Sequence, residues 1–369
     1  MLSLAARLAI HRFEGISLSV PVSPAPPDTA DTALVDRESG VKAAPAISVV
    51  IPTRNRAKLL ARALASIRSQ SFSSFEVLVI DDGSSEQTKA QYAAIWQNLD
   101  DRFILHCVST SAAPGIGPSM SRNRGIAAAR APIITFCDDD DSWTSDEHLA
   151  MMAQVFSTLP ARSVYIANQV AVTTDGAIVK RRWLPGLEHA VRARRRSHPH
   201  GYLVTCKDLA ASGGFAQLNI LAVSKALIDS QGGFWTRTTY EEDRDFFWRA
   251  VDHAAAIFFN PMLIAQHNVA DQTRKENISS DLSQVERWIT SALVSQHIAL
   301  SVNHRTIKRL CTVYEGDILR HLSVHFSKNN QHVLSFQYAC RAMGARLSWK
   351  WSVYTFLLAC RLWMRRSMT

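Results

Sequence analysis

Short apolar segments that alternate with helical segments constrain the fold of this 369-residue chain more than any other feature. Residues 47–51 (ISVVI) and 77–80 (VLVI) have the composition of strands, and residues 57–70 between them carry leucine and isoleucine at helical spacing. The order strand, helix, strand is then repeated by residues 103–108, 119–129 and 132–136. Near-continuous apolar strands are typical of parallel sheets covered by helices on both faces. The sequence therefore predicts an α/β fold.

Composition divides the chain into three parts. Residues 1–45 form an N-terminal extension that ends in a linker with five prolines, and we expect the folded α/β domain over residues 46–270. Residues 271–369 have a helical pattern and form a C-terminal appendage with a basic, aromatic tail. Within that part, the mixture of tryptophan and cationic residues over 347–363 suits either a membrane interface or a helix packed on its own domain.

Overall composition excludes several classes of protein. With 47% hydrophobic and 20% charged residues, the chain is neither fibrous nor largely disordered, and it lacks the long apolar runs of a multi-span membrane protein. The net charge of +9 is concentrated in residues 180–196, with seven Lys or Arg and one acid, and in residues 341–369, with six Lys or Arg and no acid. Two basic patches favour a localised anionic partner over general nucleic-acid binding.

The most acidic segment of the chain follows the predicted strand 132–136. It reads FCDDDDSW, with four consecutive carboxylates from Asp138 to Asp141. Adjacent carboxylates repel one another unless a cation lies among them, and open α/β sheets bind ligands at the carboxyl ends of their strands. Oxygen ligands suit Mg²⁺ or Mn²⁺, so the sequence predicts a divalent metal site here. The pattern TSDE at residues 144–147 further predicts a capping box that opens the next helix.

Two more polar loops follow predicted strands. Asp81 and Asp82 end the strand 77–80, and the segment PTRNR at residues 52–56 ends the first strand. The acidic loop at Asp81 and Asp82 alone is a weak signal, because Asp, Gly and Ser are also ordinary turn residues. Since three polar loops would meet at one edge of a parallel sheet, their convergence predicts a binding site there.

These motifs together resemble the family 2 glycosyltransferases, which are inverting enzymes with the GT-A fold, a Rossmann-like nucleotide-diphospho-sugar transferase architecture. The resemblance is carried by ISVVIPTRNRAKLL and FEVLVIDDGSS, then by SRNRGIAAARAPIITFCDDDDSW and GGFWTRTTYEEDRDFFWRAV. It covers residues 46–268, and both ends of the chain lie outside it.

The resemblance implies roles for the residues that match. Pro52, Thr53 and Arg54, with Asp81 or Asp82, would hold the base and ribose of a nucleotide donor. The residues that match the family's Arg-Asn pair near the nucleotide and phosphates are Arg122 and Asn123.

The resemblance also implies a metal site and a catalytic pair. Asp138 and Asp140 match the family's D-x-D motif, the first towards the ribose and the second to the metal. Asp139 is counted with the donor-binding residues. The alternative that Asp139 and Asp141 form the D-x-D motif stays open. His267 is the second expected metal ligand. The family's E-D pair is matched by Glu242 and Asp243, with Asp243 as the base.

The expected protein is thus a Mg²⁺- or Mn²⁺-dependent inverting glycosyltransferase of cell-surface polysaccharide or glycolipid synthesis. Its expected partners are a nucleotide-sugar donor and a glycan or lipid-linked acceptor. Among the donors, a UDP-sugar is the first choice. An anionic membrane surface is a further expected partner, and nucleic acid is not. The expected location is cytoplasmic, including the inner face of the plasma membrane. Two other functions stay open: a nucleic-acid-binding or scaffold protein with a degenerate transferase domain, and a nucleotidyltransferase.

Overall fold

The computed structural model describes residues 44–109, 115–173, 175–269 and 282–366. The predicted N-terminal extension and linker lie outside these ranges, apart from their last two residues. The description below begins at the first strand.

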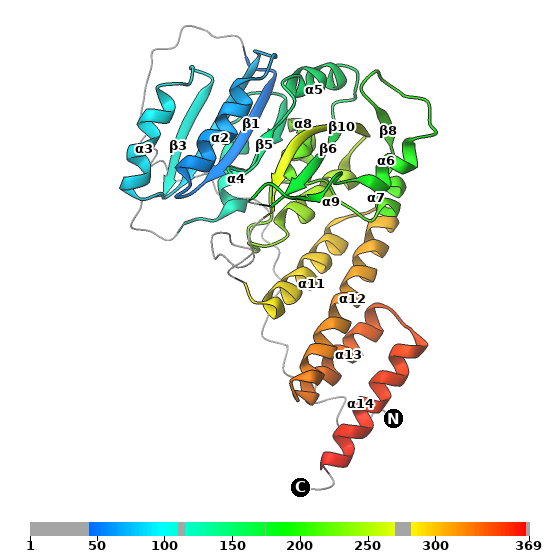
Figure 1. Ribbon diagram of the computed structural model, residues 1–369. Helices are drawn as coiled ribbons and strands as arrows, with labels where there is room; N and C mark the ends of the chain where they lie inside the picture. The colour runs from blue at the N-terminus through cyan, green and yellow to red at the C-terminus, as the bar shows by residue number, and fades with distance from the viewer. Residues whose placement is uncertain (1–43, 110–114, 174, 270–281, 367–369) are drawn as a thin grey trace. The chain divides into compact units, whose positions relative to one another are not determined.

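Four parallel strands form the first half of the sheet (Figure 1). They are β1 (Ile47–Thr53), β2 (Phe75–Asp82), β3 (Phe103–Ser109) and β4 (Ile133–Phe136), in the order β3-β2-β1-β4. Every described side chain of β2 and β4 is buried, as is typical of a sheet covered on both faces. The predicted strands are confirmed. Because the chain order reverses beside β1, a crevice is expected between the ends of β1 and β4.

Three helices connect these strands. They are α2 (Ala57–Arg68), α3 (Glu86–Trp96) and α4 (Pro118–Ala128). In α2 the buried side chains Leu60, Leu64 and Ile67 lie on one face, as the spacing predicted. Sequence analysis did not predict α3, whose only fully buried side chain is Tyr92. A helix with so little apolar surface gives almost no periodic signal.

The second half of the sheet is mixed. It continues from β4 in the order β9-β6-β10-β5, where β9 is antiparallel to both β4 and β6, and β6 is parallel to β10. Two short strands pair at its margin, β7 with β6 and β8 with β10. Their bounds are β5 Ser142–Trp143, β6 Ser163–Val172, β7 Ile178–Lys180, β8 Tyr202–Val204, β9 Leu221–Ser224 and β10 Ala256–Asn268.

The predicted capping box at residues 144–147 is wrong. Helix α5 (His148–Phe156) begins only after this segment, three residues later than the box predicts, and no side chain caps it. The backbone N–H groups of Thr144 and Ser145 instead donate to the carbonyl of Ile264 in β10, at 2.7 and 3.3 Å. Tertiary hydrogen bonds to a neighbouring strand have therefore replaced the local cap.

The remaining helices follow the sheet strands in sequence. The shorter ones are α6 (Pro185–Val191), α7 (Cys206–Ser212), the 3₁₀ turn η1 (Leu218–Ile220), α8 (Lys225–Gln231) and α9 (Glu242–His253). The C-terminal part is helical, as predicted, and consists of α11 (Gln284–Ser301), α12 (Arg305–Lys328), α13 (His332–Ala345) and α14 (Trp349–Arg366). None of the helices in the described ranges is long and apolar enough to cross a membrane.

The first two C-terminal helices share the core of the sheet domain. Val294 and Ile298 of α11 and Ile307 of α12 are buried in the same apolar cluster as β1, β2 and β4. Helix α11 packs on α9, and α12 packs on α7 (Figure 1). The domain boundary near residue 270 stays a prediction, but the contacts make α11 part of what supports the sheet domain.

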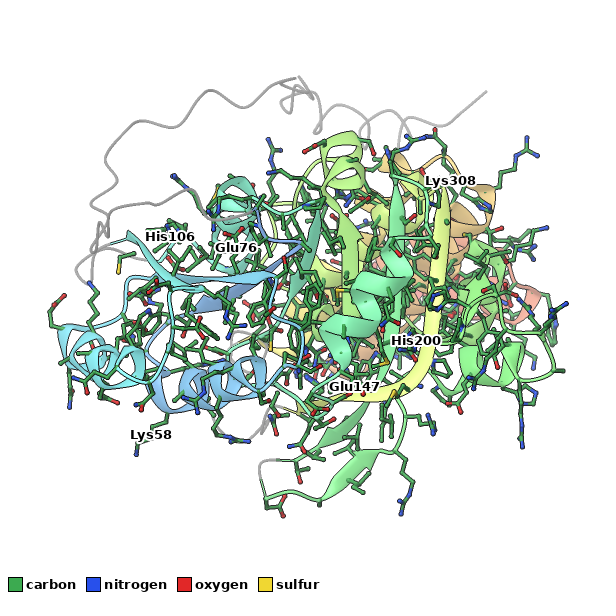
Figure 2. The ribbon with its side chains drawn as sticks, turned by 90° about the horizontal axis from the view of Figure 1, so that it is seen from above. Lys58, Glu76, His106, Glu147, His200 and Lys308 are labelled. Carbon is green, nitrogen blue, oxygen red and sulfur yellow. The ribbon has the colours of Figure 1, made fainter. Side chains whose placement is uncertain are left out.

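A buried charge at the amino end of the strands has its own partners. Glu76 of β2, which is labelled in Figure 2, accepts hydrogen bonds from Ser48 of β1 at 2.7 Å and from the backbone and guanidinium of Arg130 at 2.8 and 2.7 Å. These bonds compensate the burial of its carboxylate. They lie near the start of β2, whereas Asp81 and Asp82 lie at its other end.

Close packing between α4 and β1 gives a stability prediction. A Cβ added to Gly125 of α4 would lie 2.3 Å from a methyl carbon of Val50 in β1, so Gly125→Ala should force the two elements apart. We expect it to lower the free energy of unfolding by about 1–3 kcal/mol, against the better helix propensity of alanine. The control is Gly344→Ala in α13, where a Cβ meets nothing within 4 Å and stability should rise by up to about 1 kcal/mol. Urea unfolding measures both, and equal shifts would contradict the packing argument.

Candidate active site

The four aspartates after β4 face alternate directions. The side chains of Asp138 and Asp140 are 34% and 22% exposed, whereas those of Asp139 and Asp141 are 6% and 2% exposed. A turn closed by the Asp141 N–H and the Asp138 carbonyl, at 3.1 Å, gives the loop this form. One pair is therefore open to a ligand and the other is used inside the protein.

Asp139 joins the ends of β1 and β4. Thr53 Oγ1 donates to its carboxylate at 2.8 Å, and Arg56 Nη1 lies 3.0 Å away. Burial raises the pKa of Asp139 to about 6, although Arg56 and Thr53 both lower it. The hydroxyl of Thr53, expected to hold the donor, thus positions the acidic loop. Sequence analysis gave Arg56 no role, although a run of four acids calls for nearby cations.

Asp141 joins the same loop to the end of β10. His267 Nδ1 lies 3.0 Å from its Oδ1, and the backbone N–H of Asn268 donates to it at 2.8 Å. Burial lowers the pKa of His267, but the carboxylates of Asp141 and Asp140 outweigh it and raise the pKa to about 8. The other ring nitrogen lies 3.3 Å from the amide nitrogen of Gln217. The expected metal ligand His267 therefore lies beside the acidic loop.

Arg122 connects the acidic loop with the predicted catalytic pair. This side chain of α4 is almost fully buried, and its two terminal nitrogens lie 2.7 Å from Asp138 and 2.9 Å from Glu242. Its guanidinium also lies 5.4 Å from the ring centre of Phe234. The two carboxylate motifs are more than a hundred residues apart in the sequence, and Arg122 brings them together.

Asn123, the neighbour of Arg122, is used differently. Its amide donates to the carbonyl of Phe234 at 2.9 Å and accepts from the Phe234 N–H at 2.7 Å. A Cβ on Gly233 would lie 2.2 Å from the Asn123 oxygen, so only glycine fits beside this clamp. Asn123 therefore fixes the segment before α9, and its amide is not directed at a donor by these contacts.

The predicted base lies at the start of α9. Asp243 is half-buried, and its Oδ1 accepts the N–H of Arg244 at 2.7 Å. Burial and the neighbouring Glu242 raise the pKa of Asp243 to about 7. A carboxylate with a pKa near neutrality is suited to accept a proton in catalysis.

A C-terminal helix supports the loop that carries this base. Glu241, which precedes α9 with a φ of 59°, accepts a 2.8 Å hydrogen bond from the hydroxyl of Tyr314 in α12. The guanidinium of Arg244 lies 4.3 Å from the ring centre of Tyr314. Sequence analysis missed Tyr314 because no local motif marks a residue that acts from another part of the chain.

The expected nucleotide-binding residues lie at the ends of β1 and β2. Asp81 is fully buried and accepts hydrogen bonds from Ser84 and Tyr92, while Asp82 accepts the N–H groups of residues 116 and 117 at 2.7 and 2.8 Å. A Cβ on Gly115 would collide with both Arg54 and Asp82. Pro52 is half-buried and Arg54 is exposed. The structure thus brings these residues together, but it leaves the choice between Asp81 and Asp82 as a prediction.

The acidic loop has the donor chemistry of a divalent cation site. Burial and the carboxylates of Asp141, Asp139 and Asp138 raise the pKa of Asp140 well above its ordinary value, so Arg56 compensates its charged form only in part. Carboxylate oxygens are the ligands that Mg²⁺ and Mn²⁺ prefer. Among the described residues, however, no three His, Cys, Asp or Glu side chains already form a metal-binding cluster.

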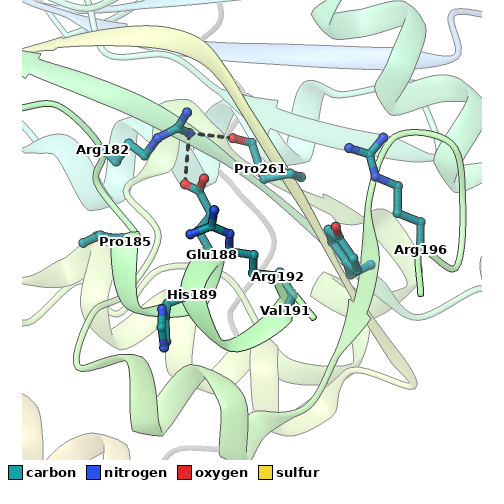
Figure 3. A pocket seen from close by; sticks show the side chains of 9 residues that line it. Arg182, Pro185, Glu188, His189, Val191, Arg192, Arg196 and Pro261 are labelled. Atoms are coloured by element: carbon teal, nitrogen blue, oxygen red, sulfur yellow. Dashed lines mark hydrogen bonds and ion pairs between the residues drawn. The ribbon is translucent and has the colours of Figure 1, made fainter. Parts of the chain in front are cut away.

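A separate cavity of about 530 Å³ lies beside α6 (Figure 3). Arg182, Arg192 and Arg196 line it, all from the basic run, and none of residues 138–141 does. Arg182 is 3.0 Å from Glu188 and donates to the carbonyl of Pro261 at 3.1 Å. No partner of the Arg192 side chain is found among the described residues. The cavity is therefore cationic.

Comparison with known proteins assigns part of the sheet domain to a family. Residues 48–211 match the family model described as Glycosyl transferase family 2. These residues form a family 2 glycosyltransferase domain. The resemblance that the sequence motifs suggested is confirmed for this part of the chain.

Two curated relatives resemble the family 2 domain. The chain is 39% identical over 103 residues to the GalNAc(5)-diNAcBac-PP-undecaprenol beta-1,3-glucosyltransferase of Campylobacter jejuni, covering 27% of this chain and 31% of that protein. It is 29% identical over 136 residues to the amylovoran biosynthesis glycosyltransferase AmsB of Erwinia amylovora, covering 36% of this chain and 44% of that protein. The matches span less than half the length of either relative.

A solved structure resembles a larger part of the chain. The crystal structure of residues 1–349 of S. aureus TarS in complex with UDP-GlcNAc superposes with a TM-score of 0.54 and 19% identity, over 81% of each chain. This similarity confirms the predicted GT-A fold with its helical C-terminal region, and at this identity it shows the fold alone.

The contact between Tyr314 and Glu241 gives a second prediction. Tyr314→Phe removes the hydroxyl that pairs with a largely buried carboxylate, and we expect the free energy of unfolding to fall by about 1–3 kcal/mol. Tyr338→Phe in α13 is the control, because no hydrogen bond of the Tyr338 hydroxyl is found among the described residues. Urea unfolding of both variants tests the contact. A loss no larger than that of the control would show that Tyr314 does not support the α9 loop.

Proposed function

We propose that this protein is a metal-assisted inverting glycosyltransferase that moves a sugar from a nucleoside diphosphate to an acceptor hydroxyl. The observation that carries the proposal is the position of Arg122 between Asp138 and Glu242, at 2.7 and 2.9 Å. A donor held at the acidic loop and a base at the start of α9 would then face the same small volume. Proximity of the reacting groups in this sense is a principal source of catalysis.

The donor would lie along the ends of β1, β2 and β4. Pro52, Thr53 and Arg54, with Asp81 or Asp82, would surround its base and ribose. Asp138 and Asp140 are the less buried members of the acidic run, which supports the D-x-D register over Asp139 with Asp141. A uridine donor is proposed first, because the TarS structure of the same fold holds UDP-GlcNAc.

Asp140 and His267 would hold a Mg²⁺ or Mn²⁺ ion. When bound, such an ion supplies positive charge to the diphosphate that leaves the sugar. The protein's own contribution is to orient these ligands: Asp141 accepts a hydrogen bond from His267, and Arg56 lies 3.3 Å from Asp140. Hydrogen bonds and ion pairs made to the metal ligands by neighbouring residues fix the orientation of these ligands.

Asp243 would act as the base. Its carboxylate takes the proton of the acceptor hydroxyl while the acceptor oxygen forms a bond to the anomeric carbon. The bond from that carbon to the diphosphate oxygen breaks on the opposite face, so the configuration inverts. Glu242 is held by Arg122, and Arg122 would also place positive charge near the departing diphosphate.

The acceptor would be a glycan or a sugar on a lipid carrier. The Campylobacter relative is named for a PP-undecaprenol substrate and the Erwinia relative for amylovoran, which supports a role in cell-surface polysaccharide or glycolipid synthesis. The cationic cavity with Arg192 and Arg196 would suit a phosphate of such an acceptor. A lipid-linked acceptor would place the enzyme at the inner face of the plasma membrane.

Two substitutions separate donor binding from chemistry. Asp140→Ala should weaken the Mn²⁺-dependent binding of a sugar nucleotide on the order of tenfold or more, because a metal ligand is lost. Asp243→Asn should leave that binding unchanged and slow transfer by about 10²- to 10⁴-fold, because the base is lost. Calorimetry with a panel of sugar nucleotides measures binding, and nucleoside diphosphate release measures turnover.

The control is Asp229→Asn on the exposed surface of α8, which should change neither quantity. Release of pyrophosphate in place of nucleoside diphosphate would identify a nucleotidyltransferase. If no sugar nucleotide binds with or without metal, the proposed function is wrong.

The pKa of Asp243 predicts how the rate depends on pH. The base works when deprotonated, so kcat/KM should rise about tenfold per pH unit below pH 7 and level off above it. Besides burial, Glu242 and Glu241 raise this pKa and Arg244 lowers it. Glu242→Gln should therefore move the inflection to lower pH. An inflection that stays in place in this variant, or a rate independent of pH between 5 and 8, would remove Asp243 from the role of base.

A further inference from the structure

Helix α14 presents an apolar stripe to solvent. Six of its side chains are each more than half exposed, namely Trp349, Val353, Phe356, Leu357, Trp363 and Met364. At 3.6 residues per turn these positions fall on one face of the helix, with Trp349, Phe356 and Trp363 spaced seven residues apart. Exposed apolar surface of this extent, unlike isolated exposed residues, indicates a partner.

The opposite face of α14 is already used. Thr355 and Leu358 are buried, and the indole N–H of Trp351 donates to the carbonyl of Ala339 in α13 at 3.1 Å. The helix is therefore held on α13 by one side, which leaves the stripe directed away from this packing. The alternative that the tail simply packs on its own domain accounts for the buried face only.

Charge shows which partner suits the stripe. Lys350 and Arg361 are exposed on α14, and helical geometry places both beside the stripe. Residues 341–369 contain six Lys or Arg and no acid. Two copies of the chain that paired through this face would bring like charges together without a carboxylate between them. An anionic surface is complementary to the same arrangement.

We infer that α14 binds the surface of an anionic lipid membrane. The helix would lie in the plane of the membrane, with the aromatic and aliphatic stripe among the acyl chains and the cations at the headgroups. Tryptophan is enriched at this depth of a bilayer because its ring is apolar and its N–H is polar. The inference goes beyond the proposed function, because membrane binding is measured without donor, acceptor or turnover.

Flotation of the full chain with vesicles tests this surface. The protein should float with phosphatidylcholine vesicles that contain a third phosphatidylglycerol, and much less with phosphatidylcholine alone. The double variant Phe356→Glu with Leu357→Glu should lose on the order of tenfold or more in vesicle affinity. Ile289→Glu with Leu293→Glu on α11 is the matched control, because it adds the same charge at exposed apolar positions of another helix. Circular dichroism checks that all variants remain folded.

A second pair of variants tests the electrostatic part. Lys350→Gln with Arg361→Gln should weaken binding to the anionic vesicles on the order of thirty-fold. Lys308→Gln with Arg309→Gln, at exposed positions of α12, removes the same charge elsewhere and should have a much smaller effect. The inference is overturned if the wild-type chain does not float, or if each control loses as much as its test pair. It is also overturned if sedimentation shows a dimer that Phe356→Glu dissociates, with no vesicle binding.

Discussion

The repulsion among four consecutive carboxylates is the constraint on which the rest of the site depends. The fold reduces it by placing a basic side chain beside each acid: Arg122 beside Asp138, Arg56 beside both Asp139 and Asp140, and His267 beside Asp141. Buried charges are stable only when they are paired in this way. The partners come from α4, from the loop after β1 and from β10. Neutralising the acidic loop therefore requires these elements to meet, which is also what a substrate cleft requires.

The C-terminal helices also take part in pairing a buried carboxylate. Asp245 of α9 is fully buried, and its carboxylate lies 2.6 Å from His297 Nδ1 of α11 and 2.7 Å from Arg249. The His297 ring also stacks on Trp235, with ring centres 3.9 Å apart. Together with the bond from Tyr314 to Glu241, these contacts hold both sides of the first turn of α9. Substitutions in α11 or α12 would then act on the predicted base without touching a substrate.

Some elements could be predicted from the sequence because their signal is local. Strands β1, β2 and β4 contain continuous apolar runs, which are typical of strands buried on both faces. Strand β10 was missed because Asn260 and Pro261 interrupt it and its pairing with β6 contains register shifts. Strand β9 has four residues, too few for a period to appear. The capping pattern at residues 144–147 failed because β10 offered its backbone a stronger tertiary partner.

In the candidate site too, local motifs predict where residues lie, but contacts with residues far away in the sequence decide what they do. Motif positions identified which residues lie at the strand ends, and the structure does bring them to one edge of the sheet. What each side chain does there depends on neighbours far away in sequence. Thr53 is directed to Asp139 because that carboxylate is buried beside it, and Asn123 is engaged by Phe234. A motif predicts the type of a residue and its position at a strand end, whereas packing in the fold decides which groups its side chain contacts.

The two basic segments differ in how their charges are compensated. In residues 180–196, Arg182 is paired with Glu188 and Arg194 with Asp208, so part of the apparent charge is compensated within the fold. Residues 341–369 contain no acid, and across the described part of this segment the only carboxylate near a cation is Asp317, 3.8 Å from Arg346. The two segments have an equal excess of cations in the sequence, but the fold compensates this charge differently in each. In the first segment the arginines line a cavity, and in the second the excess positive charge favours an anionic surface as a partner.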